Sequence, residues 1–302
     1  MSDMGGKTPG RRGIAVFAYS EPGYVCLEEL FASGANVTAV FTHEDDPGEE
    51  IWFRSVAELA RAHGVPVRTD SKIGPDAASF LREAGAEIIL SVYYRAMIPG
   101  EVLAVPRLGA YNIHGALLPR YRGRACVNWA VLNGETRTGA TLHVMTELAD
   151  QGDIVDQEAV PIGYEDTALD VFKKVAQAAR IVLSRGLPSI EAGNPRRVPQ
   201  DESQATKFGR RRPEDGRIDW GKTAEGIYNQ VRALTHPFPG AFTELDGKRL
   251  FVWRARAAGG SPCQKPGTVV SRRPFVIAAA DGAVELLSWQ FDGEAERGAN
   301  LE

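Results

Sequence analysis

An alternation of short apolar runs and amphipathic stretches in the N-terminal third of the chain most constrains its fold. Runs of β-branched and other apolar residues predict buried strands at 14–18, 36–41 and 87–92. Apolar residues at helical spacing predict helices at 25–32, 51–63 and 77–84, and a Ser-Glu-Pro-Gly sequence predicts a turn at 20–23. Buried parallel strands are continuous apolar runs, and strands that alternate with helices form parallel sheets. The predicted fold class is therefore α/β, with a doubly wound, mostly parallel sheet.

The rest of the chain predicts a long helix, a linker and a smaller second domain. The helix covers 167–183, carries one apolar stripe and is expected to stop at Gly186 and Pro188. A polar, proline-containing segment at 192–206 is interpreted as an interdomain linker. A helix at 224–233 follows, and then short strands at 249–254, 267–270, 275–279 and 284–287. We expect a disordered tail at 1–12, a catalytic domain at 13–195 and a β-rich domain at 206–302.

Composition narrows the classes of function. The chain has 302 residues, a formal net charge of -4 and a pI of about 5.9. This balance argues against broad nucleic-acid binding, which leaves a basic footprint on a protein. No window approaches the roughly 18 apolar residues of a membrane span, and no signal sequence or metal-binding motif is found. The three cysteines, Cys26, Cys126 and Cys263, are widely spaced, so we expect reduced thiols in a cytoplasmic protein without a metal.

The candidate catalytic groups are an amide and an imidazole two residues apart, Asn112 and His114. An extended chain points residues i and i+2 to the same side, so both side chains can address one point in space. An amide donor steadies a developing oxyanion and an imidazole moves a proton, which are the two needs of acyl transfer. Asp150, just before Gly152, is the candidate carboxylate that would favour the protonated histidine, although aspartate is also common in turns.

Two further clusters have two interpretations each. Arg122 and Arg124 beside Tyr121 suit an anionic ligand, or they form a solvated basic turn. The Tyr-Tyr-Arg sequence at 93–95 would wall a flat aromatic ligand, or it packs at the end of a strand. This sequence and the candidate catalytic pair both follow apolar runs, and open α/β sheets bind ligands at the carboxyl ends of their strands.

Together, these motifs resemble a known family. Asn112-x-His114, the Gly-x-Leu-Leu-Pro-x-Tyr-Arg-Gly sequence at 115–123 and Asp150-x-Gly152 are similar to those of the formyltransferases that use N10-formyltetrahydrofolate. The resemblance covers nearly the whole chain, including Phe-Gly-Arg-Arg at 208–211 and Ile-Asp-Trp at 218–220. Within the family, the sequence looks most like the formyltransferase that modifies UDP-4-amino-4-deoxy-L-arabinose, which is often joined to a decarboxylase. The stretches that carry this closer likeness are 16–19, 41–43, 46–49, 93–95, 124–129 and 239–242.

The resemblance implies a role for each candidate residue. Asn112 would stabilise the oxyanion, His114 would shuttle the proton of the substrate amine, and Asp150 would orient the histidine. The co-substrate would be N10-formyltetrahydrofolate, and no metal would be needed. Its contacts would fall on Ala96, Met97, Ile98, Arg124, Thr146, Glu147, Leu148, Ala149 and Asp150. The implied fold is an N-terminal Rossmann-like domain followed by a C-terminal β-barrel that resembles an OB-fold. The family usually has a serine where this chain has Ala116.

The resemblance also implies the acceptor, the amine of a sugar nucleotide, as in the lipid A modification that confers polymyxin resistance. Methionyl-tRNA formyltransferase is the relative with a different substrate, and it has a basic loop after the second strand. Here residues 43–50 are mostly acidic and would repel a phosphate backbone. Other amino sugars on UDP, GDP or dTDP are alternative acceptors. Two alternative functions are a hydrolase that releases formate from the same co-substrate and a non-catalytic folate-binding module. No membrane partner is expected, and the oligomeric state is unknown.

Overall fold

The computed structural model describes residues 11–48, 50–69, 73–74, 76–259 and 264–298. The chain divides into two compact units. The first unit comprises Met1–Gly123, Thr138–Val160 and Lys173–Lys207, and the second comprises Arg124–Arg137, Pro161–Phe172 and Phe208–Glu302. Of the tail expected at 1–12, residues 1–10 lie outside the described residues.

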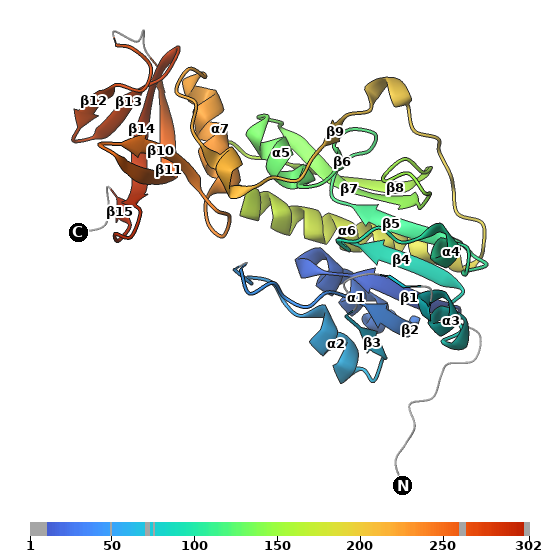
Figure 1. Ribbon diagram of the computed structural model, residues 1–302. Helices are drawn as coiled ribbons and strands as arrows, with labels where there is room; N and C mark the ends of the chain where they lie inside the picture. Colours follow the sequence, from blue (N-terminus) through green and yellow to red (C-terminus); the bar gives the residue numbers. More distant parts are fainter. Residues whose placement is uncertain (1–10, 49, 70–72, 75, 260–263, 299–302) are drawn as a thin grey trace. The chain divides into compact units, whose positions relative to one another are not determined.

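Among the described residues, seven strands form the sheet of the first unit, in the order β3-β2-β1-β4-β5-β7-β8 (Figure 1). Their bounds are β1 Gly13–Ala18, β2 Asn36–Phe41, β3 Val67–Arg68, β4 Ile88–Val92, β5 Ala110–His114, β7 Arg137–Val144 and β8 Ile154–Pro161. The first five pair in parallel, and β5 pairs antiparallel with β7. The strand order reverses between β1 and β4, which is where doubly wound sheets bind ligands. The predicted sheet is therefore confirmed.

Helices cover both faces of this sheet (Figure 1). They are α1 Ser20–Ala32, α2 Val56–Ala62, α3 Asp76–Glu83, α4 Gly100–Leu103 and α6 Ala168–Glu191. Ile14 of β1 lies in a core with Leu27 of α1 and Val182 of α6. The next residue, Ala15, lies in a second core with Leu81 of α3. Because successive side chains of a strand point to opposite faces, these two cores lie on the two sides of the sheet.

The turn predicted at 20–23 is wrong, because α1 begins at Ser20. Pro22 stands in the first helical turn, where its missing N–H removes no intrahelical hydrogen bond. Glu21 in the same turn interacts favourably with the positive end of the helix dipole. A Pro-Gly pair therefore interrupted the helical pattern of the sequence without interrupting the helix.

The predicted stop of the long helix at Gly186 and Pro188 is also wrong, because α6 continues to Glu191. A Cβ atom at Gly186 would collide with the side chain of Leu142, so the glycine allows the helix to lie close to β7. Leu187 and Ile190 are buried in the core, and their burial offsets the hydrogen bond that Pro188 removes. No described helix, α6 included, is long and apolar enough to cross a bilayer.

The second unit contains an antiparallel sheet, as the short strands predict. The strand order is β10-β11-β14-β13-β12, and β15 also pairs with β14. The bounds are β10 Ala241–Leu245, β11 Lys248–Gly259, β12 Val269–Arg272, β13 Phe275–Ala278, β14 Gly282–Phe291 and β15 Arg297–Gly298. The unit also holds α5 Cys126–Leu132 and α7 Ala224–Leu234, which contact each other. Two short strands, β6 Arg122–Gly123 and β9 Lys207–Phe208, form a separate ladder.

Candidate active site

The candidate site lies at the carboxyl end of β5, where Asn112 and His114 are the third and fifth residues of the strand. The alternate residues Tyr111 and Ile113 are buried in the apolar core, so the two polar side chains share the other face. This is the arrangement that the spacing in the sequence predicts. Antiparallel pairing with β7 adds a neighbour, because His143 stands directly opposite Asn112.

His114 is buried and held at both ring nitrogens. Its Nε2 lies 2.7 Å from the carbonyl oxygen of Tyr121, and its Nδ1 lies 3.5 Å from Asp150 Oδ1. A carbonyl oxygen can only accept a hydrogen bond, so Nε2 is protonated and donates a hydrogen bond to the carbonyl oxygen of Tyr121. Tyr121 is itself fixed by its backbone N–H, which donates to Thr206 Oγ1 at 2.8 Å. The ring nitrogen that remains to exchange a proton is therefore Nδ1, which faces the carboxylate.

Asp150 is the carboxylate that joins the cluster. Its Oδ2 accepts a hydrogen bond from the Gly123 N–H at 2.8 Å, and its Oδ1 lies 3.7 Å from His143 Nε2. Burial opposes ionisation of this group, but the charge of His114 and the hydrogen bond from the Gly123 N–H outweigh it. Together they hold the pKa of Asp150 well below its usual range. The site thus keeps an ionised acid beside two imidazoles.

His143 is the residue of this cluster that sequence reasoning missed. It is buried, its Nε2 lies 3.1 Å from Asn112 Nδ2, and its Nδ1 lies 2.8 Å from the carbonyl oxygen of Val144. The sequence offers one partial signal, since His143 falls inside an apparent strand that precedes Asp150. Its place opposite Asn112 depends on the register of two antiparallel strands, which that signal does not contain.

The segment predicted as a linker, 192–206, supports the site instead of only joining two parts. Gln200 donates through Nε2 to the carbonyl oxygens of Asp150 and Gly152, at 2.9 and 2.7 Å. Its Oε1 accepts from the Arg122 guanidinium at 2.7 Å, and Glu202 accepts from the same guanidinium at 2.6 Å. Arg122 is buried, so its charge serves this network and the anionic-ligand interpretation does not hold for it. Gln200 therefore holds the backbone on both sides of the Asp150 loop.

The residues expected to contact folate fall into two segments of the first unit and one residue of the second. Residues 96–98 follow β4, and residues 146–150 follow β7. The Glu147 carboxylate lies beside Gly100, where an added Cβ would be 2.9 Å from its Oε1, so the two segments are neighbours. Met97 and Leu148 are largely exposed, at 62% and 61%. Arg124 belongs to the second unit, where its backbone N–H donates to the Phe208 carbonyl oxygen at 3.1 Å.

The tyrosine cluster after β4 packs against a histidine after β2. The Tyr94 and His43 rings stack at 4.2 Å, and the Arg95 N–H donates to His43 Nε2 at 3.0 Å. The Arg95 guanidinium lies 4.6 Å above the ring of Tyr19. In the described part of the chain, no group of three or more histidine, cysteine or acidic side chains is arranged to hold a metal ion.

The fold and the site define a doubly wound α/β enzyme with a polar centre at the carboxyl end of its parallel sheet. Residues 16–187 match the family model described as formyl transferase, and residues 210–300 match the C-terminal domain of formyl transferases. The first match alone covers more than half of the chain. The chain therefore belongs to the formyltransferase family and is a formyltransferase enzyme.

Three solved structures with the same fold were determined with bound ligands. An N-formyltransferase from Helicobacter canadensis, in complex with folinic acid and dTDP-3-aminofucose, has a TM-score of 0.72 and 19% identity and covers 90% of this chain and 98% of its own. WlaRD, a sugar 3N-formyltransferase solved with dTDP and 5-N-formyl-THF, has a TM-score of 0.70 and 18% identity, covering 94% and 99%. HypX from Aquifex aeolicus, in complex with tetrahydrofolic acid, has a TM-score of 0.65 and 19% identity, covering 95% of this chain but 46% of HypX.

Proposed function

We propose that this enzyme transfers a formyl group from N10-formyltetrahydrofolate to the primary amine of a sugar nucleotide. The observation that carries this proposal is the cluster of Asn112, His114 and Asp150 at the end of β5, with His114 Nδ1 facing the acid at 3.5 Å. An amide donor, a titratable ring and an ionised carboxylate are the groups that acyl transfer to an amine requires. The folate supplies the formyl carbon.

Each group has a defined task in this proposal. The neutral amine forms a bond to the formyl carbon, and Asn112 Nδ2 donates to the oxygen on which negative charge develops. His114 Nε2 stays on the Tyr121 carbonyl, so the proton that leaves the amine passes through Nδ1. Ionised Asp150 stabilises the positive charge of the ring while it holds that proton. The bond between the formyl carbon and N10 then breaks, and the proton ends on N10.

The proposed folate site within the first unit consists of residues 96–98 and 146–150. Support comes from the adjacency of these two segments beside the catalytic cluster. Three solved structures of this fold bind a folate derivative, which is consistent with a folate co-substrate here. Exposed apolar side chains such as Met97 and Leu148 are suited to pack against a flat pterin.

Two kinds of observation favour a sugar nucleotide as the acceptor. Two solved structures of the same fold are described as binding dTDP-3-aminofucose or as a sugar 3N-formyltransferase. The loop after β2 carries Glu44, Asp45 and Asp46, which would repel the phosphates of a tRNA. Our specific proposal is UDP-4-amino-4-deoxy-L-arabinose, which rests on the likeness of the sequence to the enzyme that formylates this sugar.

The test is a formyl-transfer assay with purified protein and N10-formyltetrahydrofolate. Acceptors are UDP-4-amino-4-deoxy-L-arabinose, a dTDP-linked 3-amino sugar and initiator methionyl-tRNA, with an amine-free control. Formylation of the UDP sugar supports the full proposal, and formylation of the dTDP sugar alone keeps the reaction but changes the acceptor. Formylation of tRNA alone, or formate release without an amine, would overturn it.

Two variants test the assigned roles. We expect His114→Ala and Asp150→Asn each to lower kcat by about 100-fold or more, which is typical for the loss of a positioned proton-transfer group. Near-normal turnover by both variants, with an unchanged fold, would show that the proton takes another route.

A further inference from the structure

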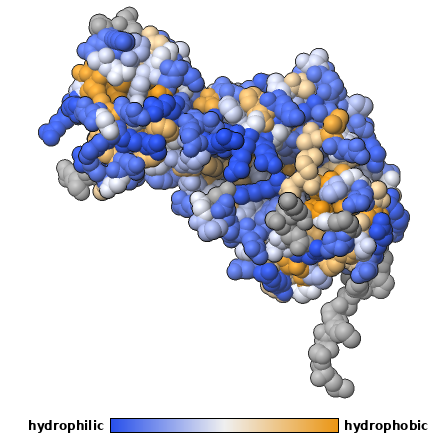
Figure 2. All heavy atoms as spheres, viewed as in Figure 1, coloured by the Kyte–Doolittle hydropathy of each residue, from blue (hydrophilic) through white to orange (hydrophobic). Residues whose placement is uncertain are grey.

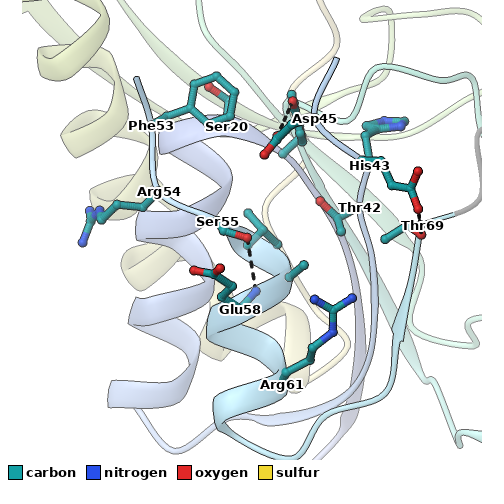
Figure 3. Close-up of a pocket in the computed structure, with 14 residues that line it drawn as sticks. Ser20, Thr42, His43, Asp45, Phe53, Arg54, Ser55, Glu58, Arg61 and Thr69 are labelled. Atoms are coloured by element: carbon teal, nitrogen blue, oxygen red, sulfur yellow. Dashed lines mark hydrogen bonds between the residues drawn. The ribbon is translucent and has the colours of Figure 1, made fainter. Parts of the chain in front are cut away.

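A cavity of about 220 Å³ lies beyond the carboxyl ends of β1 and β2, and the mechanism above does not use it (Figure 3). Its lining includes Tyr19 and Ser20 after β1, and Phe53 and Ser55 just before α2. The four residues after β2, at 42–45, also line it. We propose that this cavity binds the nucleoside of the sugar nucleotide and that its carboxylates select ribose over 2′-deoxyribose. This inference rests on the proposed function and narrows its substrate class.

Aromatic rings form one corner of the cavity. The rings of Tyr19 and Phe53 meet edge to face with centroids 5.2 Å apart, and those of Tyr19 and His43 with centroids 5.4 Å apart. His43 Nε2 accepts the Arg95 N–H, and burial followed by the charge of Arg95 lowers the pKa of His43. The imidazole is therefore an uncharged ring at neutral pH. A flat base packs well against such a corner, because every base has an apolar face.

Two carboxylates beside these rings are each anchored through one oxygen. Asp45 Oδ1 accepts from the Tyr19 hydroxyl at 2.8 Å, and Glu44 Oε1 accepts from the Thr69 hydroxyl at 3.3 Å. Within the described residues, the second oxygen of each carboxylate accepts no hydrogen bond. A ribose presents two neighbouring hydroxyls as donors, whereas a 2′-deoxyribose presents one. Doubly wound domains that bind dinucleotides use an acid after the second strand for this purpose, and Glu44 and Asp45 stand in that position.

Along the edge of the sheet, the cavity, Arg95 and the catalytic pair follow one another in the same order as the nucleoside, the diphosphate and the amino sugar of a sugar nucleotide. The cavity lies at β2 and β1, the exposed Arg95 follows β4, and Asn112 and His114 end β5. Three strand spacings separate β2 from β5, a span of about 14 Å. Arg95 then lies where the diphosphate would pass, and its guanidinium fork matches phosphate oxygens. Two other cations line the cavity: Arg54 turns its guanidinium outward (Figure 3) and pairs with Glu21, and Arg61 belongs to α2.

The experiment measures nucleotide binding directly by calorimetry with the purified protein. The probes are UDP, GDP and their 2′-deoxy counterparts, without folate. We expect a ribonucleotide to bind about tenfold more tightly than its 2′-deoxy form, because one hydrogen bond to a carboxylate is lost. Glu44→Gln and Asp45→Asn are each expected to reduce this ratio. Asp46→Asn is the matched control, since it removes one charge from the same loop outside the cavity lining and should keep the ratio.

The outcomes separate this inference from the proposed function. Equal affinity for both forms, no binding of any of the four nucleotides, or a ratio that neither cavity variant changes would overturn the cavity assignment. Formyl transfer that is equally efficient with ribose- and deoxyribose-linked amino sugars would also overturn it, while leaving the proposed function intact. A ribose preference in binding, without formyl transfer to any amine, would support the cavity assignment and overturn the proposed function.

Discussion

Asn112 Nδ2 lies 3.1 Å from His143 Nε2 across the ladder between β5 and β7, and this contact determines which way the amide faces. His143 Nδ1 lies 2.8 Å from the Val144 carbonyl oxygen, which can only accept, so this nitrogen carries the ring proton. Nε2 of the uncharged ring is then an acceptor, and Asn112 must turn its NH2 group toward it. One N–H is held by His143, and the second N–H is left to donate to the oxyanion of the proposed reaction.

His143→Phe is therefore expected to lower kcat about tenfold while the KM for both substrates changes less than twofold. The amide loses the partner that orients it, and a single oxyanion donor contributes about 100-fold or more to kcat. His143→Gln keeps an acceptor and should recover part of the loss. Steady-state kinetics of the single variants and of the double variant with Asn112→Ala check this. If the two residues acted independently, their effects would add, whereas positioning through Asn112 makes His143→Phe nearly silent in the Asn112→Ala background.

The depressed pKa of Asp150 predicts a specific acid sensitivity. A carboxyl group whose pKa is lower in the folded state stabilises the fold above its unfolded pKa of about 3.9, and this contribution is lost as pH falls through the folded pKa. Asp150→Asn removes the contribution. The difference in unfolding free energy between wild type and Asp150→Asn should be constant from pH 7 to about 5 and shrink below that. Urea unfolding at each pH measures it, and a difference that grows on acidification would contradict the assignment.

Much of the fold could be predicted from the sequence, because its central strands are buried on both faces. Such strands must be apolar throughout, and the runs that became β1, β2 and β4 show this directly. The two errors at helix ends have one physical origin. Pro22 and Pro188 break helices in isolation, but a first-turn position and a buried final turn respectively make them tolerable.

The site could be predicted only where a local rule applies. The two-residue period of a strand is such a rule, and it places Asn112 and His114 on one face. No local rule gives the register between β5 and β7, which brings His143 to Asn112. The same holds for Gln200, whose side chain reaches backbone atoms about fifty positions earlier in the chain. A polar segment without a periodic pattern, such as 192–206, is predicted as a linker, because the sequence does not show which contacts it makes.

Gln200→Ala tests whether this segment positions Asp150. The change removes donors to two carbonyl oxygens and an acceptor for the buried Arg122, so we expect a loss of about 2 kcal/mol in unfolding free energy. We also expect kcat to fall about tenfold, because the Asp150 loop is less well held. Ser203→Ala, an exposed position on the same segment, is the control and should change neither quantity measurably. Normal kcat in a destabilised Gln200→Ala protein would show that the glutamine serves stability alone.

Gly152→Ala should damage the site through the backbone. An added Cβ at this position would collide with the Val144 carbonyl oxygen, which belongs to β7 and cannot move aside as a flexible side chain could. The loop must therefore shift, taking with it Asp150, which lies two residues away with a positive φ of 60°. We expect a loss of about 1–3 kcal/mol in stability, and a fall in kcat larger than that of Gln200→Ala. Gly209→Ala is the matched control, since an added Cβ there meets nothing within 4 Å. Thermal unfolding and kcat of the two variants, measured side by side, give the comparison, and equal behaviour would mean that the loop tolerates the displacement.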